Sequence, residues 1–184
     1  MDSANKDPEF DLLASIAATI KSDYIREGVA DPWLGSPFAW ILSGPSSRQK
    51  GAIGEQLIAG WCAAKGLDVI RSKNSDADRI IGGRKVEIKF STLWQSGVYK
   101  FQQLRDQDYE QVICLGISPQ RANCWVIPKD VIMIHTTPQH AGQRGSDTRW
   151  LTFPADRPPE WLSSYGGSLS QAFRVLQGNT ISNP

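Results

Sequence analysis

One short segment, residues 75–89, restricts the possible folds of this chain more than any other. Gly82-Gly83 separates two runs of apolar and β-branched residues, and paired glycines accept the positive φ angles of a two-residue hairpin turn. A turn at these glycines also fixes which residues lie opposite each other. The predicted pairs are Ile81 with Arg84, Ile80 with Lys85, Arg79 with Val86, Asp78 with Glu87 and Asp76 with Lys89.

This hairpin gathers charged side chains on one face, because residues two apart on a strand point the same way. The four that share the face are Asp76, Asp78, Glu87 and Lys89. Carboxylates that face each other repel, and a divalent cation between them removes the repulsion. Mg²⁺ suits such a place, since it takes one or two carboxylates, retained water and substrate phosphate. Lys89 could then steady the charge that develops beside the metal.

The arrangement resembles the PD-(D/E)XK nuclease superfamily, the restriction-endonuclease fold. The motif of that family is an acid, a hairpin and then acid-x-lysine, which Asp78 and Glu87-Ile88-Lys89 match, although the proline often found before the first acid is absent. The resemblance covers about residues 46–128. It implies an α/β fold with a central mixed sheet of about five strands flanked by helices, and hydrolysis of phosphodiester bonds with Mg²⁺, for which Mn²⁺ is a substitute.

The resemblance also implies a role for each residue of the motif. Asp78 and Glu87 would hold the metal, Ile88 between the acid and the lysine completes the expected ligand set, and Lys89 would orient or activate water. Glu55 would assist through a second metal or a bound water, with Asp76 as a reserve ligand. A solvated hairpin with scattered charges is the alternative interpretation of the same residues.

The segment 46–66 is predicted to be a helix that precedes the hairpin. Ser46 or Ser47 caps it, Gly66 ends it, and apolar side chains recur at three- and four-residue spacing. That expected buried stripe is Ile53, Leu57, Trp61 and Ala64. Glu55 lies off the stripe beside Gly54, where a missing side chain permits close approach. Members of the superfamily often carry a glutamate on the first core helix, which Glu55 matches; an ordinary surface acid is the alternative.

Residues 90–109 are rich in amides, hydroxyls and aromatic rings, and a helix is expected over about 99–109 with Phe101, Leu104 and Tyr109 inward. Gln and Arg recognise adenine and guanine edges, whereas Ser, Thr and Lys suit phosphates. A polar helix that caps the sheet, and a plain solvated loop over 139–149, are the alternatives to DNA contact. The residues expected to contact DNA are Lys50, Ser91, Thr92, Trp94, Lys100, Gln102, Gln103, Arg105, Arg144 and Arg149.

The other elements follow from apolar runs and turn signals. Strands are expected at 67–70, 111–118, 124–128 and 150–153, and helices at 10–25, from 158 onward and at 169–177; residues 129–134 fit a helix or a strand. We expect a single domain over 1–184, with a nuclease core at about 46–128, an N-terminal helical extension at 9–45 and a C-terminal extension at 129–184.

Composition limits the class of protein. The chain of 184 residues is 40% hydrophobic, enough for a sizeable core, and it has no apolar run near the roughly 20 residues of a membrane span. Cys62, Cys114 and Cys124 lie in apolar contexts without metal-ligand spacing, as expected of reduced core residues in a cytoplasmic protein. A formal net charge of +1 favours selective DNA contacts over a broad electrostatic grip.

The sequence therefore predicts a Mg²⁺-dependent, sequence-specific endonuclease of double-stranded DNA, of the type II restriction kind. Cutting both strands favours a homodimer, and a sequence-specific enzyme would normally have a companion DNA methyltransferase acting on the same site. Two alternatives stay open. One is a structure- or mismatch-directed nicking or resolving nuclease, and the other is a DNA-binding module of nuclease fold that has lost catalysis.

Overall fold

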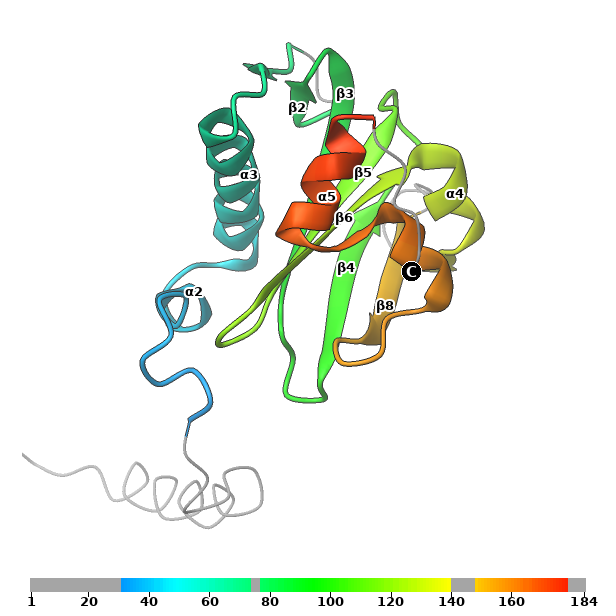
Figure 1. Cartoon of the computed structure of the whole chain (residues 1–184). Helices are drawn as coiled ribbons and strands as arrows, with labels where there is room; N and C mark the ends of the chain where they lie inside the picture. The colour runs from blue at the N-terminus through cyan, green and yellow to red at the C-terminus, as the bar shows by residue number, and fades with distance from the viewer. Residues whose placement is uncertain (1–30, 74–76, 140–147, 179–184) are drawn as a thin grey trace, which may run out of the picture. The chain divides into compact units, whose positions relative to one another are not determined.

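The computed structural model describes residues 31–73, 77–139 and 148–178 (Figure 1). The chain divides into two units, residues 1–34 and 35–184. In the first unit the described part is a turn, in which the Trp33 amide donates a hydrogen bond to Asp31. The expected helix at 10–25 lies outside the described residues. The single domain and its boundaries therefore stay a prediction, and the fold described below is that of the second unit.

The centre of the second unit is a mixed six-stranded sheet in the order β1-β2-β3-β5-β6-β9. Only the β3–β5 pair is parallel among these neighbours. The expected α/β class and mixed central sheet are confirmed. The expected number of five strands was wrong, because this sheet has six. The sixth is β9, whose Gly166-Gly167 carries no strand signal. The strands are β1 (Val69–Arg71), β2 (Arg79–Ile81), β3 (Arg84–Thr92), β5 (Gln111–Ile117), β6 (Ala122–Pro128) and β9 (Gly166–Ser168).

The β2–β3 hairpin forms in the predicted register over three residue pairs. Gly82 and Gly83 take φ angles of 57° and 80°, the positive values of a two-residue hairpin turn. The pairs are Ile81 with Arg84, Ile80 with Lys85 and Arg79 with Val86. The ladder ends there, so the predicted continuation to Asp78 with Glu87 is not formed, and Asp76 lies outside the described residues.

A second sheet of three antiparallel strands contains β4 (Val98–Leu104), β8 (Thr148–Pro154) and β7 (Thr137–Gln139), in the order β4-β8-β7. The strand expected at 150–153 is confirmed. The helix expected at 99–109 is wrong, because residues 98–104 form β4. Its buried positions are Tyr99, Phe101 and Leu104, and the three-residue step from Phe101 to Leu104 imitates helical spacing. A register shift in the β4–β8 ladder produces that step.

The main core lies between the two sheets and is dominated by aromatic rings. Tyr99 and Phe101 of β4 and Phe153 of β8 meet Trp125 of β6. The rings of Trp125 and Phe153 pack nearly perpendicular, with centroids 5.1 Å apart, which is a favourable edge-to-face arrangement. Gly116 of β5 accommodates this packing, since a Cβ there would lie 2.8 Å from the Tyr99 ring.

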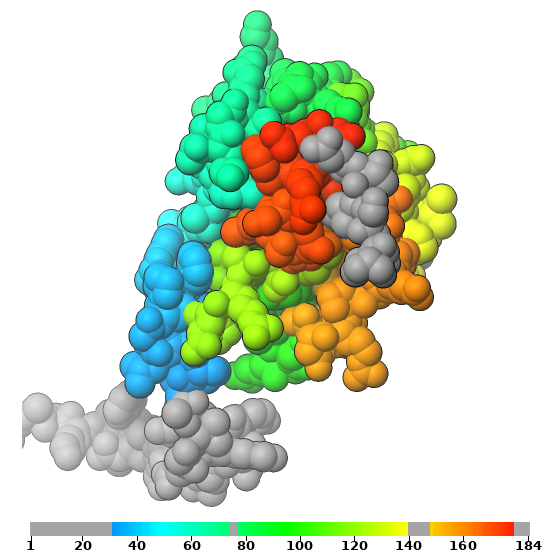
Figure 2. Space-filling model, viewed as in Figure 1, coloured from blue at the N-terminus to red at the C-terminus, as the bar shows by residue number. Residues whose placement is uncertain are grey.

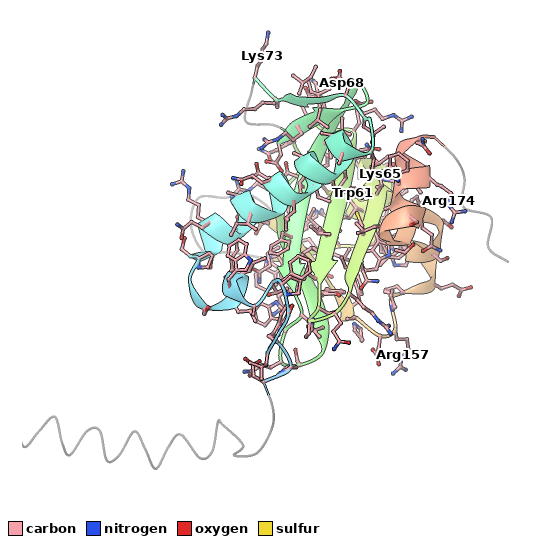
Figure 3. All side chains as sticks on the ribbon, turned by 60° about the vertical axis from the view of Figure 1, so that its left-hand side comes forward. Trp61, Lys65, Asp68, Lys73, Arg157 and Arg174 are labelled. Carbon is pink, nitrogen blue, oxygen red and sulfur yellow. The ribbon has the colours of Figure 1, made fainter. Side chains whose placement is uncertain are left out.

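Two helices pack near each other on the sheet, α3 (Ser47–Ala64) on β3 and α5 (Leu169–Leu176) on β6 and β9 (Figures 1 and 2). Ser46 and Ser168 start them, each with a capping box. Trp61 of α3, labelled in Figure 3, meets Phe173 of α5 edge-on, with ring centroids 6.1 Å apart. The remaining helices of the described residues are α2 (Trp40–Ser43), α4 (Lys129–Ile134) and the short 3₁₀ helix η1 (Glu160–Tyr165).

The buried stripe of α3 differs from the prediction. It consists of Gly54, Ile58 and Cys62, whereas Ile53, Leu57 and Trp61 are half-buried and Ala64 is exposed. The reason is a very close contact between helix and strand: a Cβ on Gly54 would lie 2.3 Å from the Phe90 Cβ. Because α3 touches β3 at Gly54, the buried face of the helix is the one that contains Gly54. It therefore differs from the face that the apolar residues alone predict.

Two expectations from the sequence hold in this part of the fold. Pro128 is the last residue of β6 and the N-cap of α4. Residues 129–134, for which the sequence fitted either a helix or a strand, are a helix. All three cysteines are free thiols buried in the core. None of the helices in the described ranges combines the length and the apolar character that a membrane span needs.

We predict that Gly54→Ala destabilises the protein by about 1–3 kcal/mol, because the new methyl group forces α3 away from Phe90. Gly60→Ala is the matched control on the same helix, since a Cβ there meets nothing within 4 Å. That control should be neutral or stabilising by up to about 1 kcal/mol. Urea unfolding monitored by tryptophan fluorescence measures both, and equal effects would contradict the close contact.

Candidate active site

A pocket opens beside the strand that carries the acid-x-lysine motif. β2 pairs with residues 84–86 of β3, while β3 continues to Thr92. Residues 88–92 of β3 line the pocket, whose volume is about 680 Å³. The other lining residues come from α2, α3, the segment before β2, the loop between β3 and β4, and β4: Leu42, Ser47, Arg48, Lys50, Gly51, Glu55, Asp78, Leu93, Trp94, Gln95, Lys100, Gln102 and Gln103.

Asp78 is anchored at this edge of β3 by two hydrogen bonds. Its backbone amide donates to the Val86 carbonyl at 3.0 Å, and its Oδ2 accepts from the Ile88 amide at 2.7 Å. The Asp78 carboxylate therefore accepts the hydrogen bond that the Ile88 amide would donate to a backbone carbonyl if β2 continued alongside β3. Since the amide and carbonyl of one strand residue point to the same side, the Ile88 carbonyl is also directed to this edge. Asp78 and the Ile88 backbone thus present oxygens together.

Glu87 and Lys89 form a largely enclosed ion pair next to this edge. The Lys89 Nζ lies 2.6 Å from the Glu87 Oε1, and their side chains are 16% and 10% exposed, respectively. Both lie on the face of β3 that turns toward the second sheet, because they neighbour Val112 and Cys114 of that core. Burial raises the pKa of Glu87, the Lys89 charge lowers it in part, and Asp78 and Glu55 raise it further.

Glu55 reaches the cluster from α3, on the other side of the strand edge. Its Oε2 lies 3.4 Å from the Arg79 Nη1, and Arg79 also donates to the Asp78 carbonyl. Burial raises the pKa of Glu55 most, the negative charge of Asp78 adds to this, and Arg79 and Lys89 oppose it. Glu55, Asp78, Glu87 and Lys89 therefore form a single electrostatic group, which we call the acid–lysine cluster.

The acid–lysine cluster fits a divalent cation held by few protein ligands. Among the residues that the structure describes, no three His, Cys, Asp or Glu side chains converge with metal-binding geometry. Mg²⁺ does not need three, because it commonly uses one or two carboxylates with water and substrate phosphate. Burial, and then the neighbouring acids, raise the pKa values of Glu55 and Glu87 in this group. An added cation would relieve the repulsion among these acids.

Most of the residues predicted for the site do meet here, with some exceptions. Glu87 lies beneath Lys89 and is not among the lining residues. Arg105 and Arg149 do not line the pocket either; Arg149 donates to the carbonyls of Met133 and Thr136. Asp76 and Arg144 lie outside the described residues. The predicted residues that line the pocket are Lys50, Glu55, Asp78, Ile88, Lys89, Ser91, Thr92, Trp94, Lys100, Gln102 and Gln103.

Sequence reasoning missed two arginines that belong to this site. Arg48 and Gly51 line the pocket with Glu55 on α3, and their three- and four-residue spacing would have placed them on one helix face. Arg79 pairs with Glu55, a contact between distant segments that no local pattern contains. With Lys50, Lys89 and Lys100, Arg48 makes four cationic side chains on the pocket wall against two carboxylates.

Comparisons with known proteins give similarity to solved structures. No protein-family model and no curated protein matches the chain. Among solved structures, a bacterial homing endonuclease, I-Ssp6803I, is similar over 74% of this chain and 95% of its own, with 19% sequence identity and a TM-score of 0.48.

We predict that Glu55→Gln changes how stability depends on pH in metal-free buffer. A carboxyl whose pKa is raised by folding binds its proton more tightly in the folded state, so the free energy of unfolding falls as pH rises through that pKa. Glutamine does not titrate, so the free energy of unfolding of Glu55→Gln does not fall through this group as pH rises. Urea unfolding from about pH 4 to about pH 8 should show the variant gaining on the wild type as pH rises; parallel profiles would contradict the assigned environment.

Proposed function

We propose that the protein is a Mg²⁺-dependent, sequence-specific endonuclease of double-stranded DNA, of the type II restriction kind. The observation that carries the proposal is the enclosed Glu87–Lys89 ion pair beside Asp78 and Glu55 at the rim of a pocket. A fold built only for stability gains little from buried charges of this kind, since their desolvation offsets their attraction. Perturbed acids at a pocket are instead typical of a functional site.

The pocket wall supports a polyanionic substrate. Four cationic side chains line it against two carboxylates, although the whole chain carries a formal net charge of only +1. Positive charge is thus concentrated where the acids lie, as phosphate binding requires. Thr92 adds a hydroxyl to the same wall, and Trp94 adds an exposed ring. These groups suit the sugar-phosphate backbone and the bases of DNA.

Each residue of the cluster has a distinct role in this proposal. Asp78, Glu87 and the Ile88 carbonyl would hold Mg²⁺, or Mn²⁺ as its substitute, which supplies charge neutralisation at the phosphate and a more acidic water. Lys89 would hold the negative charge that develops on the scissile phosphate. Glu55, whose pKa is raised by burial and by Asp78, would hold a water at the cluster and accept its proton. Lys50 and Lys100 would bind flanking phosphates.

The rest of the proposal follows from the substrate. A single pocket of this kind attacks one strand at a time, so cutting both strands calls for two copies, and we propose a homodimer. An enzyme that cuts double-stranded DNA at a fixed sequence endangers the genome of its own cell. We therefore propose a companion DNA methyltransferase that protects the same sequence, and a cytoplasmic location for both proteins.

We predict that Asp78→Asn, Glu87→Gln and Lys89→Ala each reduce cleavage by roughly 10²- to 10⁴-fold, because each removes a group that acts on the reacting phosphate or its metal. Lys85→Ala is the matched control: it lies on the same strand and face as Lys89 but pairs with Asp108. Unmethylated phage DNA incubated with the full chain and Mg²⁺ should give discrete bands, with none in EDTA.

The other outcomes of this experiment discriminate between functions. Smeared or nicked products that depend on Mg²⁺ would favour a structure-directed nuclease. Uncleaved DNA that stays bound to the wild type and to all three variants would favour a binding module and contradict the roles given to the acids.

We further predict that Mg²⁺ raises the melting temperature of the wild type and not that of Asp78→Asn. A ligand that binds only the folded state stabilises it by about 2.7 kcal/mol at 100 times its dissociation constant. For a chain of this size that corresponds to a shift of roughly 5–10 °C. Differential scanning calorimetry at increasing Mg²⁺ measures the shift, with K⁺ at equal ionic strength as the control; equal shifts in both proteins would place the metal elsewhere.

A further inference from the structure

The second strand that borders the pocket, β4, contains a bulge at Gln102-Gln103. Tyr99 to Phe101 pair regularly with β8, and Phe101 lies opposite Leu151. The next pair is Leu104 with Arg149, so two glutamines on β4 stand opposite one residue, Trp150. Two residues against one is the defining count of a β-bulge, and bulges are frequent beside active sites, where they redirect side chains.

The bulge changes which side chains enter the core. Strict alternation after Tyr99 and Phe101 would turn residue 103 inward. With the extra residue, Leu104 is buried instead, while Gln102 is half-buried and Gln103 is exposed. Both glutamines line the pocket that Asp78 and Lys89 also line. The chain thus keeps two adjacent amide side chains out of the core and beside the acid–lysine cluster.

The backbone of Gln103 is strained to achieve this. Its φ angle is 57°, and it is the only residue other than glycine with a positive φ in the described ranges. Glycine adopts this conformation without cost, whereas a residue with a side chain pays for it. Such strain is frequent at functional sites. A glutamine at a place where glycine would be more stable indicates that its amide group is needed.

Contacts of Lys100 with β3 and with two tryptophan rings hold the bulge in place relative to β3, the strand that carries Glu87 and Lys89. The Lys100 amide donates to the Ser91 Oγ at 2.9 Å, which ties β4 to β3 two residues beyond Lys89. The Lys100 ammonium lies 4.2 Å from the centre of the Trp94 ring and 5.3 Å from that of Trp150, opposite the bulge. Cation–π contacts of this kind hold the lysine in place. A phosphate-binding cation therefore stands near the two amides.

We propose that the Gln103 side chain recognises an adenine of the DNA substrate through its major-groove edge, with Gln102 beside it. The inference rests on the proposed function. An amide offers one donor and one acceptor side by side, which match adenine N7 and N6. Guanine presents two acceptors there, cytosine one donor, and thymine one acceptor and a methyl group. Adenine is thus the base that satisfies both halves of the amide.

The test is a binding selection that does not require cleavage. The full-length wild type and Gln103→Gly are incubated with a duplex library randomised over the central base pairs, in Ca²⁺ without Mg²⁺, and the retained duplexes are sequenced. Glycine at this position keeps the left-handed backbone and removes only the amide side chain, so the bulge survives. We expect the wild type to enrich adenine at one position of the retained duplexes. In Gln103→Gly that enrichment should be smaller by roughly 5- to 150-fold.

A matched substitution and a modified base sharpen the result. Gln120→Ala, in the turn between β5 and β6 and outside the pocket lining, should keep the wild-type preference. At the adenine position, 7-deazaadenine removes the acceptor N7, so it should weaken binding by the wild type and leave binding by Gln103→Gly unchanged.

The contrary outcomes separate the two proposals. If the wild type retains DNA without enriching adenine, or if Gln103→Gly keeps the same preference, the inference about Gln103 is overturned and the nuclease proposal is untouched. If the wild type retains no duplex at all, the proposed function fails, and the inference that depends on it fails as well.

Discussion

The contact between α3 and β3 at Gly54 and Phe90 determines how closely Glu55 can approach the other groups of the site. Because Gly54 has no Cβ, the helix backbone approaches the Phe90 side chain within a distance that any other residue would prevent. Glu55 is the next residue, and the close contact brings its carboxylate to the strand edge where Asp78 accepts from the Ile88 amide. On the opposite face of the same strand are Glu87 and Lys89. One glycine thus joins acids from two layers of the fold.

The acids of the acid–lysine cluster lie close together in a partly buried place. Lys89 and Arg79 partly neutralise three acids, yet the pKa values of Glu55 and Glu87 stay raised, chiefly by burial and then by the neighbouring acids. Crowding of this kind costs stability in a protein without ligand. In the proposed function, a divalent cation and a phosphate that bind together would relieve this crowding beside the cationic wall of the pocket.

The sequence predicted the parts of this structure that depend on local chemistry. The Gly82-Gly83 turn fixed the hairpin register, serine caps marked the start of α3, and apolar runs located β5 and β6. Non-local packing caused the errors. The bulge at Gln103 made a strand look helical, and the contact at Gly54 moved the buried stripe of α3. The Arg79–Glu55 pair joins residues 24 apart in sequence, so no local pattern could reveal it.

Paramagnetic broadening by Mn²⁺ tests most directly whether Asp78, Glu87 and the Ile88 carbonyl form one divalent-cation site beside Glu55. Substoichiometric Mn²⁺ is added to the ¹⁵N-labelled full-length protein, and the loss of amide signals is mapped by NMR. We expect the signals around Glu55, Asp78 and residues 87–89 to vanish first, those of β8 to persist, and excess Mg²⁺ to restore the lost signals. Broadening centred elsewhere, or of Glu55 without residues 87–89, would contradict it.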